Sequence, residues 1–309
     1  MGLVLSTSWN AWRHKNGKKI IAEIEKLGFE QVELSFNLTD SIVRDIKDLA
    51  ANKHIIVSSL HNFCPIPQGI ERHSALPDFY SMASTDGEER QKSLKYTKIT
   101  IDTALDLGAA AVVLHCGRVE IPDKTRSLTD LCLLGMDSSE DFIKIRNEYA
   151  QQRRQFQQAF FDNALRSLDE LNRYAESKNI LLGVETRIYH REIPSFEETA
   201  VILDKFKGSN IFYWHDTGHA QINEKLGFSS HKQYLDSYAD KMIGIHLHDV
   251  SAYKDHKAPS CGEIDFTMLR PYIKKNTIKV VEVHHPTSPA EIRKGKEYLE
   301  RVFDAENLN

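Results

Sequence analysis

Short runs rich in β-forming residues alternate with longer helical segments along the whole of this 309-residue chain. The runs cover residues 2–6, 31–35, 55–60, 110–115, 180–185, 211–215, 242–248 and 278–283. Such alternation is typical of successive βαβ units, which place parallel strands in one sheet. Because about eight units close a parallel barrel, the sequence predicts an α/β fold, a (β/α)8 TIM barrel.

The intervening segments have the spacing of helices that bury one face. Apolar residues recur three and four positions apart, as in Ile20, Ile24 and Leu27, and Gly28 follows where a left-handed helix cap is expected. Barrels of roughly 250 residues with insertions fill a chain of this length as one unit. We therefore expect a single TIM-barrel domain over residues 1–309.

Two connections are longer than a strand-to-helix loop requires. Residues 62–88 follow the third predicted strand and residues 116–140 follow the fourth, so both loops start at the same end of the barrel. Long loops in compact domains often form lids or substrate walls, although insertions are also tolerated at a small entropic cost. We interpret these extended loops as lids.

The charge balance and the chain start restrict the partners. Forty basic and 44 acidic side chains give a formal charge of −4 without a basic block, which disfavours nucleic acid as a partner. The first residues contain neither a cationic leader nor a membrane-spanning apolar run, so no membrane partner is expected and a cytoplasmic location is predicted. The cysteines form no C-x-x-C pair and are interpreted as reduced thiols.

Ionisable side chains occupy nearly every predicted strand end. In chain order they are Glu33, His61, His115, Glu185, Asp216 with His219, His246 with His248, and Glu282. Parallel strands converge at one mouth of a barrel, so these groups become neighbours there. Clustered charges at a narrow mouth repel and lose hydration, and a compensating positive charge is therefore expected.

Glu185, Asp216, His246 and Glu282 offer oxygen and nitrogen donors that suit a divalent metal ion. Mn²⁺, Mg²⁺, Co²⁺ and Zn²⁺ all accept such a set, which does not discriminate sharply among them. The alternative for each carboxylate is an ion pair with a nearby arginine or lysine. Four such strand ends together favour the metal.

The motifs at these positions resemble the xylose-isomerase-like TIM-barrel superfamily, which includes sugar isomerases, ketose 3-epimerases, inosose and dehydroshikimate dehydratases and apurinic endonucleases. The resemblance spans nearly the whole chain and is carried by GVETR at Glu185, WHDTGHA at Asp216, GIHLHD at His246, HKAPSCGEIDF, and VVEVHH at Glu282. It implies these four residues as metal ligands, with His219 reaching the substrate or a further metal. For His248 we favour a hydrogen-bonding role at the strand end.

The resemblance also implies roles for three further side chains. His61 and His115 match zinc ligands of the endonuclease branch, but sugar-acting members keep histidines there for substrate hydroxyls, and we prefer this second interpretation. The endonuclease branch has an aspartate two residues before the histidine that corresponds to His256, whereas Lys254 stands here. We assign His256 to substrate binding.

A mechanism follows from this predicted site. Isomerases and epimerases remove a proton next to a carbonyl, and a cation stabilises the resulting enediolate. Glu185 and Glu282 are the candidates for base and acid, and are then metal ligands and proton carriers at once. Arg187 lies two residues after Glu185, so it either binds a substrate hydroxyl, carboxylate or phosphate, or pairs with a nearby glutamate.

The sequence thus predicts a metal-dependent isomerase or epimerase of carbohydrate metabolism that acts on a sugar, a sugar phosphate or a related keto-polyol. The alternatives are a dehydratase or other lyase of the inosose or dehydroshikimate type, then an apurinic endonuclease or a non-catalytic binding protein. The expected partner is a carbohydrate-like small molecule. The sequence does not fix the oligomeric state, and a homo-oligomer is compatible with it.

Overall fold

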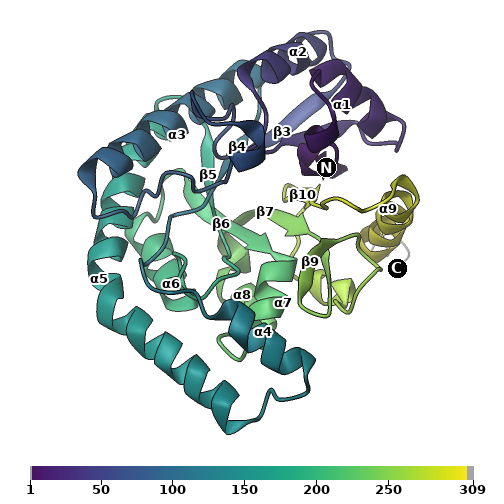
Figure 1. Cartoon of the computed structure of the whole chain (residues 1–309). Helices are drawn as coiled ribbons and strands as arrows, with labels where there is room; N and C mark the ends of the chain where they lie inside the picture. The colour runs from purple at the N-terminus through teal and green to yellow at the C-terminus, as the bar shows by residue number, and fades with distance from the viewer. Residues whose placement is uncertain (1, 305–309) are drawn as a thin grey trace.

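A closed barrel of eight parallel strands forms the centre of the computed structural model, which describes residues 2–304 (Figure 1). The strands are β1 (Leu3–Ser6), β2 (Gln31–Leu34), β3 (Ile56–His61), β4 (Ala111–Leu114), β5 (Leu181–Glu185), β6 (Ile211–Asp216), β7 (Met242–Leu247) and β10 (Ile278–Val281). They follow one another around the barrel in chain order, and β10 pairs with β1 to close it. The predicted TIM barrel is confirmed, and each predicted run overlaps one strand. Residues 1 and 305–309 of the predicted domain lie outside the described residues.

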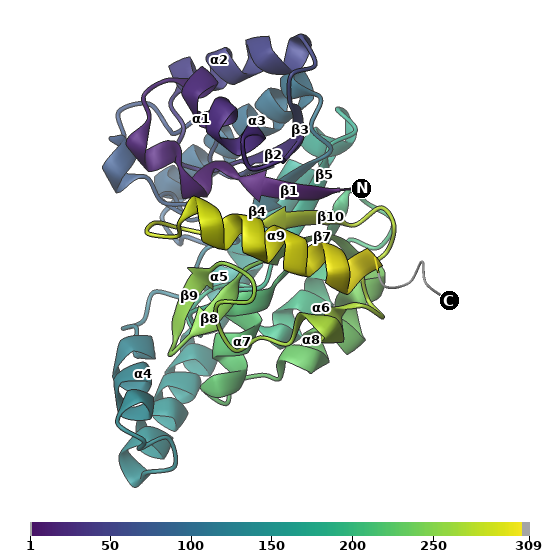
Figure 2. The same ribbon diagram turned by 90° about the vertical axis from the view of Figure 1, so that its right-hand side faces the viewer.

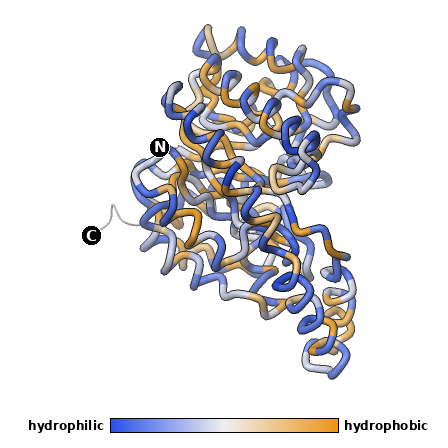
Figure 3. The backbone as a smooth tube through the Cα atoms, turned by 90° about the vertical axis from the view of Figure 1, so that its left-hand side faces the viewer, coloured by the Kyte–Doolittle hydropathy of each residue, from blue (hydrophilic) through white to orange (hydrophobic). Residues whose placement is uncertain are grey.

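Helices cover the outside of the barrel, and α9 crosses it diagonally (Figure 2). They are α1 (Gly17–Glu25), α2 (Asp40–Ala51), α3 (Gly87–Leu107), α4 (Thr125–Leu133), α5 (Glu140–Glu176), α6 (Phe196–Lys205), α7 (Thr217–Lys225), α8 (His231–Tyr238) and α9 (Pro289–Asp304), with short 3₁₀ turns η1 (Thr7–Trp9), η2 (Ala11–Arg13), η3 (Arg72–Ser74), η4 (Ala239–Lys241) and η5 (Phe266–Leu269). Hydrophilic and hydrophobic positions alternate along their turns (Figure 3). Gly28 takes a positive φ of 78°, as its cap position predicts.

The two extended connections differ in structure. The first, after β3, is irregular apart from η3, and its Pro77 lines a cavity at the barrel mouth. The second was predicted as a loop but contains the helix α4, and α4 with the start of α5 projects away from the barrel (Figure 2). The described residues include no helix long and apolar enough to cross a membrane.

Trp214 fills the inside of the barrel. It is fully buried in a cluster with Val4, Val113 and Val280, which come from other strands. Trp214 therefore packs inside the barrel and not against the surrounding helices. Since side chains alternate along a strand, Trp214 shares the inward face with Asp216, two residues further on. Glycine at 244 on the neighbouring strand makes room, because a Cβ there would lie 2.1 Å from the indole ring.

Substituting Gly244 by alanine is expected to destabilise the protein by about 1–3 kcal/mol, because the added methyl group overpacks the barrel interior against Trp214. Gly87→Ala is the matched control, since nothing lies within 4 Å of a Cβ at that helix start. Urea unfolding of both variants measures the difference. Equal midpoints for the two variants would contradict this packing.

A short antiparallel hairpin follows β7 and folds over the barrel mouth. Its strands are β8 (Asp249–Ser251) and β9 (Lys254–Lys257). The Asp249 carboxylate anchors the hairpin by accepting hydrogen bonds from the backbone N–H groups of Val250, Gly262 and Ile264. The hairpin places His256, which has a φ of 54°, against the ring of His248, the residue that directly follows β7.

Candidate active site

Glu185, Asp216, His246 and Glu282 converge at the barrel mouth from the ends of β5, β6, β7 and β10. One potential ligand atom of each lies within 4.8 Å of those of the other three, and all four residues are buried. Nδ1 of His246 is the centre of the group. It lies 2.6 Å from Oε1 of Glu185, 3.1 Å from Oε2 of Glu282 and 3.5 Å from Oδ2 of Asp216.

The charges in this group depend on one another. Burial alone would lower the pKa of His246, but the carboxylates of Glu282, Glu33 and Glu185 outweigh it and raise that pKa well above its ordinary value. Burial opposes ionisation of Asp216, yet His219 and His248 hold its pKa well below the usual range. A positive charge thus stabilises three clustered carboxylates. Three oxygen donors around one imidazole nitrogen also fit a divalent cation.

Glu33 fixes the orientation of the His246 ring. Its Oε1 lies 3.2 Å from Nε2 of His246, and the hydroxyl of Ser59 donates a 2.8 Å hydrogen bond to its Oε2. Nδ1 therefore faces the three carboxylates. Metal-binding histidines are commonly oriented in this way by a carboxylate on their second ring nitrogen. The strand-end pattern included Glu33 but assigned it no role, because its contact with His246 depends on side-chain packing inside the barrel.

The second oxygen of Glu185 meets a different set of groups. Nε2 of His115 lies 2.7 Å and Nε2 of His61 3.8 Å from Oε2, and the Arg187 guanidinium donates to the same atom. Arg187 also pairs with Glu192 at 3.0 Å, so the ion-pair alternative for this arginine is present. Burial and the charge of Arg187 lower the pKa of His115 to about 3, which makes its imidazole neutral.

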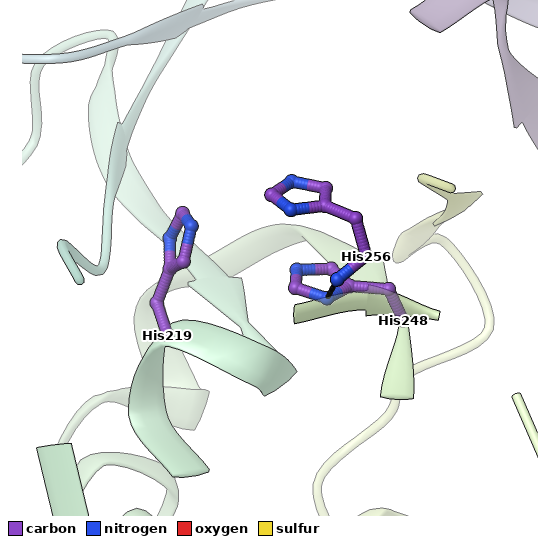
Figure 4. A group of neighbouring side chains, drawn as sticks. All are labelled: His219, His248 and His256. Carbon is purple, nitrogen blue, oxygen red and sulfur yellow. Dashed lines mark hydrogen bonds between the residues drawn. The ribbon is translucent and has the colours of Figure 1, made fainter. Parts of the chain in front are cut away.

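Three more histidines lie beside this group (Figure 4). His219 projects from the first turn of α7 toward His248 and His256, whose rings stack with centroids 4.2 Å apart. The backbone N–H of His256 donates to Nδ1 of His248, and Nε2 of His248 lies 2.9 Å from Oδ1 of Asp216. His248 therefore has the hydrogen-bonding position that we expected at the strand end.

The hairpin adds a charged pair to the site. Oδ2 of Asp255 lies 3.1 Å from Nδ1 of His256, and Lys254 is exposed. Burial lowers the pKa of His256, but Asp255 outweighs this and raises it to about 9. The ring of His284 also stacks on that of His256, with their centroids 3.7 Å apart. His284 was not among the predicted site residues, although its place two residues after Glu282 could have indicated it.

A cavity of about 160 Å³ opens above these residues. The lining includes seven of the residues predicted to act in the site: Glu185, Glu282, His61, His115, His219, Arg187 and His256. Asp216 does not line the cavity but contacts His219, and His246 contacts Glu282. Phe36 and Tyr189 are its aromatic walls and were not foreseen. Trp9 and Trp12 do not line it, because Trp9 is buried and Trp12 packs against His285.

Comparison with known proteins gives the family and the fold. Residues 21–302 match the family described as the xylose isomerase-like TIM barrel. No curated protein matches the chain.

Among solved structures, a D-tagatose 3-epimerase-like protein is 17% identical, with 99% of this chain and 98% of that one covered and a TM-score of 0.66. D-allulose 3-epimerase from Methylomonas sp. is 16% identical, with 98% of each chain covered and a TM-score of 0.67. An IOLI protein with a bound zinc atom is 16% identical, with 99% of each covered and a TM-score of 0.67. At these identities the similarity shows the barrel fold.

Proposed function

Because this chain belongs to the xylose isomerase-like TIM barrel family, we propose that it is a metal-dependent isomerase or epimerase of a sugar, a sugar phosphate or a related keto-polyol. One observation carries the proposal. Glu185 and Glu282 both contact Nδ1 of His246 and both line the same small cavity, so a substrate bound there would meet two carboxylates beside a group of residues that can hold a cation. This is the arrangement that proton transfer at a carbon next to a carbonyl requires.

Glu185, Asp216, His246 and Glu282 would hold the metal, and Mn²⁺, Mg²⁺, Co²⁺ and Zn²⁺ all suit their donor atoms. When bound, the cation supplies stabilisation of the negative charge that develops on the substrate oxygens. The zinc atom named for the IOLI protein, a neighbour in fold, supports a divalent ion in this barrel.

The proton-carrying groups have distinct surroundings. Oε2 of Glu185 is bound by His115 and Arg187, which together with His246 hold its pKa well below the ordinary value against the effect of burial. Oε2 of Glu282 lies 3.1 Å from His246 and 3.8 Å from His256. The two carboxylates therefore present different environments to the substrate, as a base and an acid need.

A small carbohydrate is the substrate class that the cavity favours. Its volume of about 160 Å³ is below the roughly 300–1,000 Å³ typical of sites for drug-sized ligands. His61, His115, His219, His256 and Arg187 place hydrogen-bonding groups along its wall, which suits a molecule rich in hydroxyl groups. The neighbours in fold are named for epimerisation of tagatose, allulose and a keto-glucoside, which supports the same class.

A dehydratase is the second candidate. His256 lines the cavity and carries a proton at neutral pH, since its pKa is about 9. A protonated imidazole there could assist the departure of a hydroxyl group from the same enediolate.

Incubation of the purified protein in deuterated water with ketoses, inososes and their phosphates tests the proposal. We expect deuterium at one substrate carbon and an isomeric product, with loss of both after chelation and recovery when the metal returns. A product lighter by one water would favour the dehydratase. Absence of exchange and turnover with every substrate and each of the four metals would overturn the proposal.

A further inference from the structure

A second and larger cavity, of about 550 Å³, lies beside the candidate active site. The middle of α5, the loop 186–195 that joins β5 to α6, and the segment that joins α7 to α8 enclose it. Arg187 and Tyr189 line both this cavity and the smaller one. The loop 186–195 is therefore a wall that the two cavities share.

The larger cavity has an excess of positive charge. Four arginines line it with three glutamates, but two of the acids are already neutralised: Glu198 lies 2.6 Å from Arg153 and Glu192 lies 3.0 Å from Arg187. Within residues 2–304, Arg146 and Arg154 have no carboxylate within salt-bridge distance. These two guanidinium groups are free to receive an anion.

The positive field reaches the inside of the cavity. Burial, followed by the charges of Arg153 and Arg154, lowers the pKa of His190 to about 3. The neutral His190 ring stacks on Phe228 with centroids 4.0 Å apart, and both rings line the cavity. The wall thus combines cationic groups with a flat aromatic surface, which suits an organic anion better than a bare inorganic ion.

Arg187 connects this cavity to the candidate active site. Its guanidinium contacts Glu185 and His115 on one side and Glu192 on the other. Its Nε is buried and, among the described residues, has no hydrogen-bond partner, so the side chain keeps one donor for a further acceptor. An oxyanion that competes with Glu192 for Arg187 would change the contacts that this arginine makes to Glu185.

We propose that the larger cavity binds a small molecule bearing a phosphate or carboxylate oxyanion, and that its occupancy is communicated to the candidate active site through Arg187. Arg146 and Arg154 attract the anion, and the stacked pair of His190 and Phe228 contacts the rest of the molecule. The binding itself does not depend on the proposed function. Its effect on the candidate active site rests on that function, because the effect is measured as a change in the turnover of substrate.

Titration of the metal-loaded protein with inorganic phosphate and with benzoate, a monocarboxylate that does not chelate the metal, tests the site. We expect the imidazole NMR signals of His190 to shift in a saturable manner, because a bound anion offsets the field of Arg153 and Arg154. The double variant Arg146→Gln, Arg154→Gln should bind the better probe at least about tenfold more weakly, since two charge-assisted contacts are removed.

Arg166→Gln is the matched control, since Arg166 is exposed on the same helix and does not line the cavity. It should bind like the wild type. Equal affinities for the double variant and the control, or His190 signals that do not move with either probe, would overturn the site.

The effect of anion binding on the candidate active site has its own test. The better probe should change the wild-type turnover and leave that of the double variant unchanged, while the basal rates of both agree. Saturable binding without any effect on turnover would overturn the role of Arg187 in communication. If the protein turns over none of the substrates, the binding titration still decides the site independently of the proposed function.

Discussion

Glu185→Gln and Glu282→Gln are each expected to lower the metal-dependent exchange of a substrate hydrogen with solvent by about 10²–10⁴-fold, the usual contribution of a positioned acid or base. Each change keeps the shape of the side chain but removes both the proton-accepting oxygen and one negative charge beside His246. Deuterium incorporation followed by mass spectrometry at saturating metal measures the loss.

The control for these variants is Glu25→Gln, at the exposed end of α1 on the outside of the barrel, which should exchange at the wild-type rate. Unfolding curves of all three variants separate a lost reaction from a lost fold. Exchange at the wild-type rate in both Glu185→Gln and Glu282→Gln would show that these carboxylates do not carry the proton.

Arg153→Leu is expected to destabilise the protein by about 3–5 kcal/mol, the usual effect of breaking a buried ion pair by removing one partner. Arg153 is buried on α5 and binds both carboxylate oxygens of Glu198, at 2.6 and 3.0 Å. It also donates to the carbonyl oxygens of His190 and Glu192. Its removal leaves the buried Glu198 carboxylate without a cation and releases the loop 186–195 from α5.

Arg154→Leu, at the exposed neighbouring position, is the matched control for Arg153 and should change the free energy of unfolding by less than about 0.5 kcal/mol. Denaturant unfolding of both variants gives the comparison. Equal effects of the two substitutions would mean that the Arg153–Glu198 pair does not hold α5 to this loop.

The barrel was predictable because its signal is repeated. Eight apolar runs with helical periodicity between them leave few other folds, and each run needs only approximate bounds. The helix α4 was missed because its N-cap residue, Lys124, makes no capping hydrogen bond and the helix has only nine residues. The inward position of Trp214 was within reach of the sequence, since alternation ties it to the face of Asp216.

The candidate site was predictable to the extent that strand ends determine it. Glu185, Asp216, His246 and Glu282 come together because parallel strands end at one mouth, and this follows from topology alone. The positions of Asp255 and His256 depend instead on a hairpin that turns back through residues with positive φ, which periodicity does not reveal. The ion pairs of Arg187 likewise depend on how the loop 186–195 folds.

The metal content of the purified protein tests most directly the proposal that Glu185, Asp216, His246 and Glu282 hold a divalent ion. Elemental analysis after dialysis against Mn²⁺, Mg²⁺, Co²⁺ and Zn²⁺ should find a stoichiometric ion in the wild type, and Asp216→Asn should lose most of it, because one carboxylate donor is gone. A wild-type protein that retains none of the four metals, or an Asp216→Asn variant that retains as much as the wild type, would contradict this account.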